Sequence, residues 1–153
     1  PDLTCLAKAL GGGFPIGALL ASEEVAAGFG PGDHAATFGG NPLAAAAALA
    51  AVTALVEEGL VENAAAVGAY FRERLEALAA QTALIREVRG LGLMLGAVVA
   101  VGAKAAVAAC QERGLIVNAV KDDTLRFVPP LNITREDVDT AVRILREALQ
   151  AVS

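Results

Sequence analysis

The sequence has few of the residues on which several classes of function depend. It contains no tryptophan, 4% aromatic residues and a single histidine, His34. Scarce aromatic rings leave little on which nucleic-acid bases could stack. A net charge of -5 without a basic run also disfavours binding to nucleic acid or to an anionic membrane surface. With one histidine and no cluster of cysteines and carboxylates, we expect no bound metal.

Cysteine and long apolar runs are also scarce. Cys5 and Cys110 have no CxxC partner, and each lies among apolar residues. We therefore expect both to be reduced core residues of a cytoplasmic protein. The longest apolar run, 43–56, is mostly alanine and too short to cross a bilayer. A chain of 153 residues that is 56% hydrophobic is instead expected to form an α/β protein with closely packed helices.

The hydrophobic pattern predicts two parts that meet near residue 58, where alanine-rich sequence gives way to charged sequence. In the first part we expect strands over 2–8 and 16–21, a short helix capped by Ser22, and a buried helix from Asn41 to Glu58.

In the second part we expect helices over 61–81, 103–113 and 138–152, with strands within 85–101 and from residues 115 and 124. The sequence of Thr134 and Asp137 is typical of a capped helix start. The apolar face expected for the helix over 61–81 consists of Val67, Tyr70, Phe71, Leu75 and Leu78.

Lys8 is the most unusual residue of the first part. It lies in LAKALGGGFPIGA, between apolar residues and just before three glycines. In most proteins such a lysine packs its stem and extends its ammonium to water. Apolar surroundings would instead desolvate the ammonium, which lowers the pKa of a lysine and frees the amine for Schiff-base chemistry. Because glycines also admit a bulky planar group, the segment suits a pyridoxal-phosphate enzyme.

Two further segments carry polar residues that suit the same chemistry. In HAATFGGNPLA, Thr37 precedes a Gly-Gly turn and a helix start, where a hydroxyl and backbone N–H groups can bind phosphate. An ordinary helix entry explains these residues equally well. In LRFVPP, Arg126 interrupts an apolar strand, either to face solvent or to clamp a carboxylate, and Arg89 in VRGLG is similar. GLGLMLG lacks the spacing of a dinucleotide-binding loop.

Together, PDLTCLAKALGGGFPIGA, HAATFGGNPLAAAAA and VRGLGLMLG…LRFVPPLNIT resemble the class III pyridoxal-phosphate aminotransferases, most of all the acetylornithine type. The resemblance covers essentially the whole chain and implies the C-terminal part of a fold type I pyridoxal-phosphate-dependent transferase. Residues 1–58 would end the cofactor-binding large domain, and residues 59–153 would form the small α/β C-terminal domain. The family's aspartate for the pyridine nitrogen, its stacking aromatic and its phosphate-binding loop belong to an N-terminal portion without counterpart in this sequence.

The resemblance also implies roles for individual residues. Lys8 would be the catalytic Schiff-base lysine that holds pyridoxal 5'-phosphate and moves a proton. Thr37 would donate to the cofactor phosphate across the interface of a homodimer, and Arg126 would clamp the substrate α-carboxylate. Ala36 stands where the family often has serine or threonine, so one hydroxyl contact near the phosphate is missing. Arg89 matches a recurrent family position without an assignable role.

The implied reaction is transfer of an amino group from N-acetylornithine to 2-oxoglutarate in arginine biosynthesis in the cytoplasm, with weak or no activity in this fragment alone. Ornithine, 4-aminobutyrate and succinyl-diaminopimelate are alternative amino donors within the family. An aminomutase is a further relative, which a carboxylate clamp at Arg126 disfavours. A non-catalytic α/β interaction domain is the alternative from another class, and it predicts that Lys8 and Arg126 are exposed and do not share a cleft.

Overall fold

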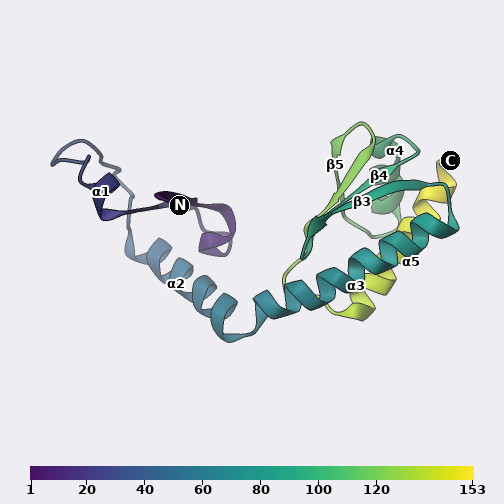
Figure 1. Cartoon of the computed structure of the whole chain (residues 1–153), viewed down its shortest axis with the longest axis horizontal. Helices are drawn as coiled ribbons and strands as arrows, with labels where there is room; N and C mark the ends of the chain where they lie inside the picture. Colours follow the sequence, from purple (N-terminus) through teal and green to yellow (C-terminus); the bar gives the residue numbers. More distant parts are fainter. The chain divides into compact units, whose positions relative to one another are not determined.

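The computed structural model describes residues 1–153 and divides them into two compact units. Unit 1 is Pro1–Gly59 and unit 2 is Leu60–Ser153 (Figure 1). The two units differ in how much they bury, because nearly all of the buried hydrophobic residues belong to unit 2.

Unit 1 begins with an antiparallel pair of strands that frames Lys8. Strand β1 (Leu3–Leu6) pairs with β2 (Ala18–Ala21), and the 3-10 turn η1 (Lys8–Gly11) lies between them. The expected return of the chain is confirmed, although β1 ends before Lys8 and not at it. The glycines and the proline that follow η1 contain no strand, as their composition predicts.

Two capped helices follow in unit 1. Helix α1 (Glu23–Ala26) begins after Ser22, whose hydroxyl accepts a hydrogen bond from a backbone N–H of the first turn. Helix α2 (Pro42–Glu57) begins after Asn41, whose side-chain oxygen accepts the N–H of Ala44 at 2.9 Å. Both predicted helix starts are confirmed.

The expected burial of α2 is wrong within unit 1. Only Ala44 of this helix is buried, whereas Leu49 is 70% and Val56 72% exposed. A helix that is apolar on all sides needs neighbours on all sides, and within its own unit α2 packs mainly against η1. Cys5 is likewise exposed and not in a core, because a two-stranded ribbon cannot enclose its own side chains.

Unit 2 is a four-stranded antiparallel sheet packed against three helices. The strand order is β3-β4-β6-β5. Its elements are α3 (Leu60–Gln81), β3 (Ile85–Leu91), β4 (Met94–Val99), α4 (Ala103–Glu112), β5 (Asn118–Lys121), β6 (Thr124–Phe127) and α5 (Arg135–Ala151).

The predicted elements of unit 2 are present, with two shifted boundaries. Helix α5 begins three residues before the expected Val138, because Thr134 and Asp137 form a reciprocal capping box. Strand β5 begins at Asn118 and not at Leu115, because the N–H of Leu115 donates to the Cys110 carbonyl at the end of α4. A backbone group used to close a helix is not available to a strand.

The core of unit 2 lies between one face of the sheet and the helices. Along β4, the buried residues Leu95, Ala97 and Val99 alternate with more exposed ones, so one face of the sheet is covered. Of the residues predicted for the apolar face of α3, Val67, Phe71, Leu75 and Leu78 are buried. Tyr70 is half-buried at the edge of this face. Helices α3 and α5 lie side by side (Figure 1), and the Tyr70 hydroxyl donates to the Asp139 carboxylate across them at 2.9 Å.

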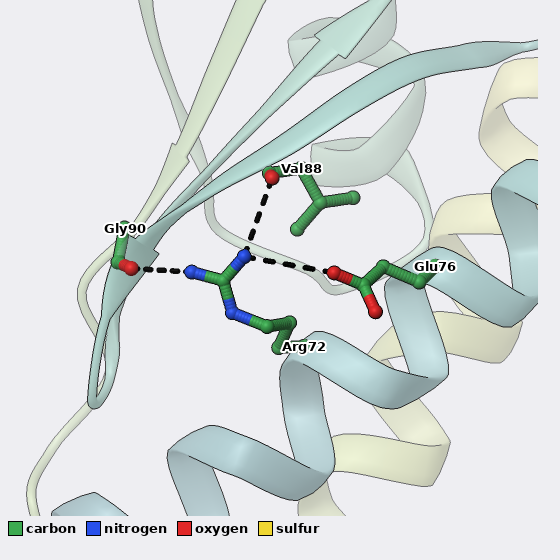
Figure 2. A network of polar contacts seen from close by, with 4 residues as sticks. All are labelled: Arg72, Glu76, Val88 and Gly90. Carbon is green, nitrogen blue, oxygen red and sulfur yellow. Dashed lines mark hydrogen bonds and ion pairs between the residues drawn. The ribbon is translucent and has the colours of Figure 1, made fainter.

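Helix α3 approaches the β3–β4 turn very closely. A Cβ at Gly68 would lie 2.3 Å from the carbonyl carbon and oxygen of Gly92, so no other residue fits there without movement of the backbone. One turn along the helix, Arg72 donates to the carbonyl oxygens of Val88, at 3.3 Å, and Gly90. Figure 2 shows these contacts together with the ion pair to Glu76 at 3.6 Å. Arg72 therefore attaches β3 to α3 on both sides of Arg89.

No single helix of the chain combines the length and the apolar composition needed to cross a membrane. Helices α2 and α3, which are broken between Glu57 and Leu60, meet that test only when they are counted together.

Candidate functional site

Lys8 has a backbone conformation that lysine rarely adopts. It is the only residue other than glycine with a positive φ, at 55°. This left-handed conformation costs a residue with a Cβ roughly 1–2 kcal/mol. The chain adopts it where β1 has ended and η1 begins, a turn closed by a hydrogen bond from the Leu10 N–H to the Ala7 carbonyl at 3.2 Å. Strain of this kind gathers at functional sites, so the conformation marks Lys8 as a candidate.

Lys8 lines an open cavity formed by its own loop. The cavity has a volume of about 560 Å³ and is otherwise lined by Ala9, Gly12, Gly13 and residues 14–16. A Cβ at Gly13 would contact nothing within 4 Å, so the loop presents bare backbone to open space. The φ values of Gly12 and Gly13, 58° and 113°, also require glycine.

The Lys8 amine is free within unit 1. Lys8 is exposed and makes no ion pair. The expectation of a partly desolvated ammonium is therefore wrong for this unit taken by itself. Its apolar neighbours Leu6, Ala7 and Ala9 are exposed too, so they cannot exclude water from it.

Thr37 lies in the turn that leads into α2. Thr37 is exposed, and its hydroxyl makes no hydrogen bond in the structure. The turn itself is held by the Asn41 side chain, which donates to the Phe38 carbonyl at 2.9 Å, and by Gly40, whose φ is 66°. The Thr37 hydroxyl is therefore free to donate to a ligand.

Arg126 lies on the open face of the sheet in unit 2. Its strand neighbours Leu125 and Phe127 are buried, so Arg126 projects to the opposite side. It makes no ion pair and no hydrogen bond, whereas Arg89 pairs with Glu87 at 3.9 Å. The guanidinium of Arg126 is therefore available to an anionic ligand.

The register of the sheet surrounds Arg126 with specific neighbours. Gly96 of β4 lies opposite Arg126 on one side and Asn118 of β5 on the other, and Arg89 of β3 lies opposite Gly96. The row Arg89–Gly96–Arg126–Asn118 crosses the whole sheet. Sequence analysis did not single out Asn118. The signal that could have found it is a polar residue inside the apolar run LIVNAV.

Lys8 and Thr37 belong to unit 1, on separate segments that no hydrogen bond joins, and Arg126 belongs to unit 2. No three residues of the types histidine, cysteine, aspartate and glutamate gather as a metal site would require. Three groups have shifted pKa values, and none of them is a predicted site residue. The pKa of Tyr70 is raised by its hydrogen bond to Asp139, that of Cys110 is raised by burial, and that of Asp137 is lowered by hydrogen bonds from Thr134.

Comparison with known proteins gives consistent matches. The family model for aminotransferase class-III matches residues 1–149. An acetylornithine aminotransferase of Caldanaerobacter subterraneus subsp. tengcongensis is 48% identical over 99% of this chain and 39% of its own length. An ornithine aminotransferase of Brevibacillus brevis is 42% identical over 97% of this chain and 37% of its own.

A solved structure agrees over the same range. The ornithine aminotransferase of Toxoplasma gondii, whose active site is partly occupied by pyridoxal phosphate, is 36% identical with a TM-score of 0.92. The match covers 99% of this chain and 37% of that chain. The chain therefore spans 37–39% of the length of these three relatives.

Proposed function

This chain belongs to the class III aminotransferases, and we propose that it is the C-terminal part of an enzyme that transfers an amino group from N-acetylornithine to 2-oxoglutarate in arginine biosynthesis. The family consists of pyridoxal-phosphate-dependent enzymes. The observation that carries the proposal is Lys8, which has a left-handed backbone conformation and a free amine beside an open cavity that two glycines help to line.

The domain assignment follows the division of the chain. Residues 1–58 end the large, cofactor-binding domain, and residues 59–153 are the small C-terminal α/β domain. The units that meet at Gly59 and the exposed apolar surface of α2 support this assignment, because a helix apolar on all sides belongs inside a larger layer. The whole enzyme is a cytoplasmic homodimer, and this fragment alone has weak or no activity.

The residues present in unit 1 fit pyridoxal phosphate. Lys8 Nζ is the atom that would hold it, and the cavity beside the glycines leaves room for a planar group. Thr37 Oγ1 would donate to its phosphate, in the neighbouring subunit of the homodimer. Ala36 offers no second hydroxyl at that position. When bound, the cofactor supplies the electron sink that amino-group transfer requires.

Lys8 also acts on the substrate as a general acid and base. A free Nζ would accept the proton from the reacting carbon of the substrate and would later return a proton to the product. The backbone that carries this amine forms a short turn closed by a hydrogen bond, which fixes where the side chain begins. Proton transfer by a positioned group contributes roughly 10²–10⁴-fold to rate.

Arg126 binds the α-carboxylate of glutamate or 2-oxoglutarate. A guanidinium presents parallel N–H donors that match the two oxygens of a carboxylate. Its freedom from ion pairs supports the role, and so does Gly96, which places no side chain beside it in the row. Asn118 on the other side adds an amide that can donate to the same anion.

Ornithine is the second candidate for the amino donor. It is favoured by the relatives from Brevibacillus brevis and Toxoplasma gondii, which are named ornithine aminotransferases. Turnover of N-acetylornithine, ornithine and 4-aminobutyrate by the full-length protein ranks the donors. We expect N-acetylornithine to have the highest kcat/KM.

The lysine assignment is tested by reduction with borohydride. A full-length protein that carries this sequence is loaded with pyridoxal phosphate, reduced, digested and mapped by mass spectrometry. We expect the adduct on Lys8, none in the Lys8→Ala variant, and a normal adduct in the matched control Lys104→Ala, which removes an exposed lysine of α4. An adduct on another lysine, or none at all, contradicts the proposal.

The arginine assignment is tested by steady-state kinetics. A hydrogen bond to a charged group contributes about 1.5–3 kcal/mol, so Arg126→Ala should raise the KM for 2-oxoglutarate roughly 10- to 100-fold. Arg126→Lys keeps the charge but loses the paired donors, and we expect an intermediate effect. The matched control Arg86→Ala removes an exposed arginine of β3 that lies outside the row Arg89–Gly96–Arg126–Asn118, and it should leave the KM for 2-oxoglutarate unchanged. An unchanged KM in Arg126→Ala contradicts the clamp.

A further inference from the structure

Helices α3 and α5 enclose a small cavity of unit 2 that contains none of the site residues described above. Its volume is about 100 Å³, enough for a few water molecules and well below the size of an ordinary small-molecule site. Its ligand must therefore be a small ion or a single compact group. Four residues of each helix line it, among them Arg74 and Gln81 of α3 and Asp139, Arg143 and Arg146 of α5.

The spacing of the lining residues explains how the cavity forms. From Arg74 on α3 and from Asp139 on α5, they stand at positions i, i+3, i+4 and i+7, which share one face of a helix. The two faces meet because α3 and α5 lie side by side (Figure 1). Leu78 and Val142 of these faces are buried, whereas the arginines are exposed. Apolar walls beneath charges of one sign concentrate the electrostatic field in a cleft.

The one carboxylate at the cavity is already engaged. Asp139 forms an ion pair with the Nε of Arg74 at 2.8 Å. Both oxygens of Asp139 also accept from the Tyr70 hydroxyl, at 2.9 and 3.0 Å. The charge of Asp139 is therefore offset by Arg74 and leaves the other arginines of the cavity without a carboxylate on its lining.

The two arginines of α5 have few partners. Arg143 pairs with Glu147 at 3.1 Å, between two exposed side chains. Arg146 makes no ion pair and no hydrogen bond with its side chain, and the Gln81 amide makes no hydrogen bond either. A guanidinium carries five N–H donors, so most donors at the cavity have no acceptor within the protein.

Positive charge exceeds negative charge at the cavity, although the whole chain has a net charge of -5. Three guanidiniums and one carboxylate line it, and Glu147 beside Arg143 offsets one further positive charge. The Leu78 carbonyl, in the last turn of α3, already accepts the N–H and the hydroxyl of Thr82, at 3.0 and 2.9 Å. This carbonyl is therefore not free to accept from the arginines.

We propose that this cavity binds a small tetrahedral oxyanion, inorganic phosphate or sulfate. Such an ion has four oxygens around one centre, so it accepts hydrogen bonds from donors of both helices at once. The guanidiniums of Arg74, Arg143 and Arg146 and the amide of Gln81 supply these donors. Because the bound ion joins α3 to α5, it also stabilises unit 2. The proposal does not depend on the proposed function, because it uses none of the residues assigned to catalysis.

The test measures binding of radiolabelled inorganic phosphate by equilibrium dialysis at constant ionic strength. It uses a full-length protein that carries this sequence, as the Arg126→Ala variant loaded with pyridoxal phosphate. Neither Arg126 nor an empty cofactor site can then take up the probe. We expect saturable binding of phosphate that sulfate displaces, whereas acetate at the same ionic strength displaces it far less.

Arginine variants locate the probe. Arg143→Gln and Arg146→Gln should each weaken phosphate about fivefold, the upper range for one exposed ion pair, and the double variant should weaken it roughly 25-fold. The matched control Arg86→Gln removes an exposed arginine of β3 that makes no ion pair, and it should leave phosphate binding unchanged.

A carboxylate variant should change the affinity in the opposite direction. Asp139→Asn removes the one negative charge on the lining and frees the Nε of Arg74, so phosphate should bind several-fold more tightly. The new amide can still accept from the Tyr70 hydroxyl, which keeps that link between the helices. The matched control Glu62→Gln removes an exposed carboxylate in the first turn of α3, roughly three turns before Arg74, and should leave binding unchanged.

The outcomes separate this proposal from the proposed function. No saturable binding of phosphate, or binding that Arg143→Gln, Arg146→Gln and Asp139→Asn leave unchanged, overturns the proposal. In either case the borohydride adduct on Lys8 and the KM effect of Arg126→Ala stand. Phosphate binding that follows the expected series in a protein without an adduct on Lys8 would uphold the cavity and overturn the proposed function.

Discussion

Replacement of Gly68 by alanine tests the close approach of α3 to the β3–β4 turn. Alanine stabilises the interior of an exposed helix by about 1 kcal/mol relative to glycine, so helix propensity alone predicts a more stable protein. In this structure the added Cβ lies 2.3 Å from two backbone atoms of Gly92. The overlap is with main chain, so rotation of a side chain cannot relieve it.

The magnitude follows from the two opposing effects. Forcing an extra methyl into a packed site costs about 1–3 kcal/mol, and a contact with backbone lies at the upper end. Subtracting the gain in propensity leaves a net loss of about 2 kcal/mol in the free energy of unfolding. Movement of α3 away from the β3–β4 turn should also weaken the attachment of β3, because Arg72 on the same helix donates to the Val88 and Gly90 carbonyls (Figure 2).

Urea denaturation of the full-length protein, followed by circular dichroism, measures the loss. The matched control is Ala69→Gly, which makes the reverse change at the adjacent exposed position and should cost about 1 kcal/mol through propensity alone. If Gly68→Ala is as stable as the parent, or more stable, the close approach does not limit this position and the reasoning is refuted.

Three further predictions concern unit 2. Thr134→Ala removes the hydroxyl that caps α5 and should cost about 1 kcal/mol, seen as faster amide exchange in its first turn. The backbone N–H of Thr134 and, to a smaller extent, its hydroxyl lower the pKa of Asp137. The stability that this carboxylate contributes is therefore present above its ordinary pKa of 3.8 and lost as pH falls through the lowered pKa. Thr134→Ala keeps the N–H, so its acid unfolding should lose only the part of this contribution that comes from the hydroxyl. Leu75→Ala, at a side chain with 0% exposure, should cost about 2–5 kcal/mol in urea denaturation, and a loss under 1 kcal/mol would contradict the core assignment. Cys110 is buried and its thiol pKa is raised, so iodoacetamide should label it only after unfolding; rapid labelling of the folded protein would show that the site opens.

Local patterns predicted most of unit 2 because its elements bury one face each. Helix α3 was predicted from the spacing of Val67, Phe71, Leu75 and Leu78, and all four lie in the core. The capping pair Thr134 and Asp137 followed from residue types at fixed offsets, although the helix itself was expected only from Val138. Such signals are short in range, so a single stretch of sequence contains them.

Unit 1 was harder to predict because its own elements bury little of its apolar surface. An all-apolar α2 predicts a buried helix, yet burial requires a surface to pack against. The same reasoning failed for Cys5 and for the ammonium of Lys8, which are exposed in the unit taken by itself. Composition indicates the environment a residue suits, but only the packed elements supply it.

The candidate site was predicted as separate residues but not as an arrangement. Arg126 and Arg89 stood out by residue type, whereas their place in one row with Gly96 and Asn118 depends on strand register. Register joins residues far apart in the chain, and no local pattern carries it.

At Lys8, the backbone conformation lowers the stability of the folded protein, while the side chain carries the amine proposed to react. Glycine is the one residue that adopts a φ of 55° without a steric penalty, so Lys8→Gly relieves roughly 1–2 kcal/mol of strain, less the greater freedom of glycine in the unfolded chain. Selection for thermal tolerance alone would therefore favour the variant that has lost the amine. Because the role proposed for Lys8 needs its amine, a directed-evolution campaign on this protein should screen turnover together with stability.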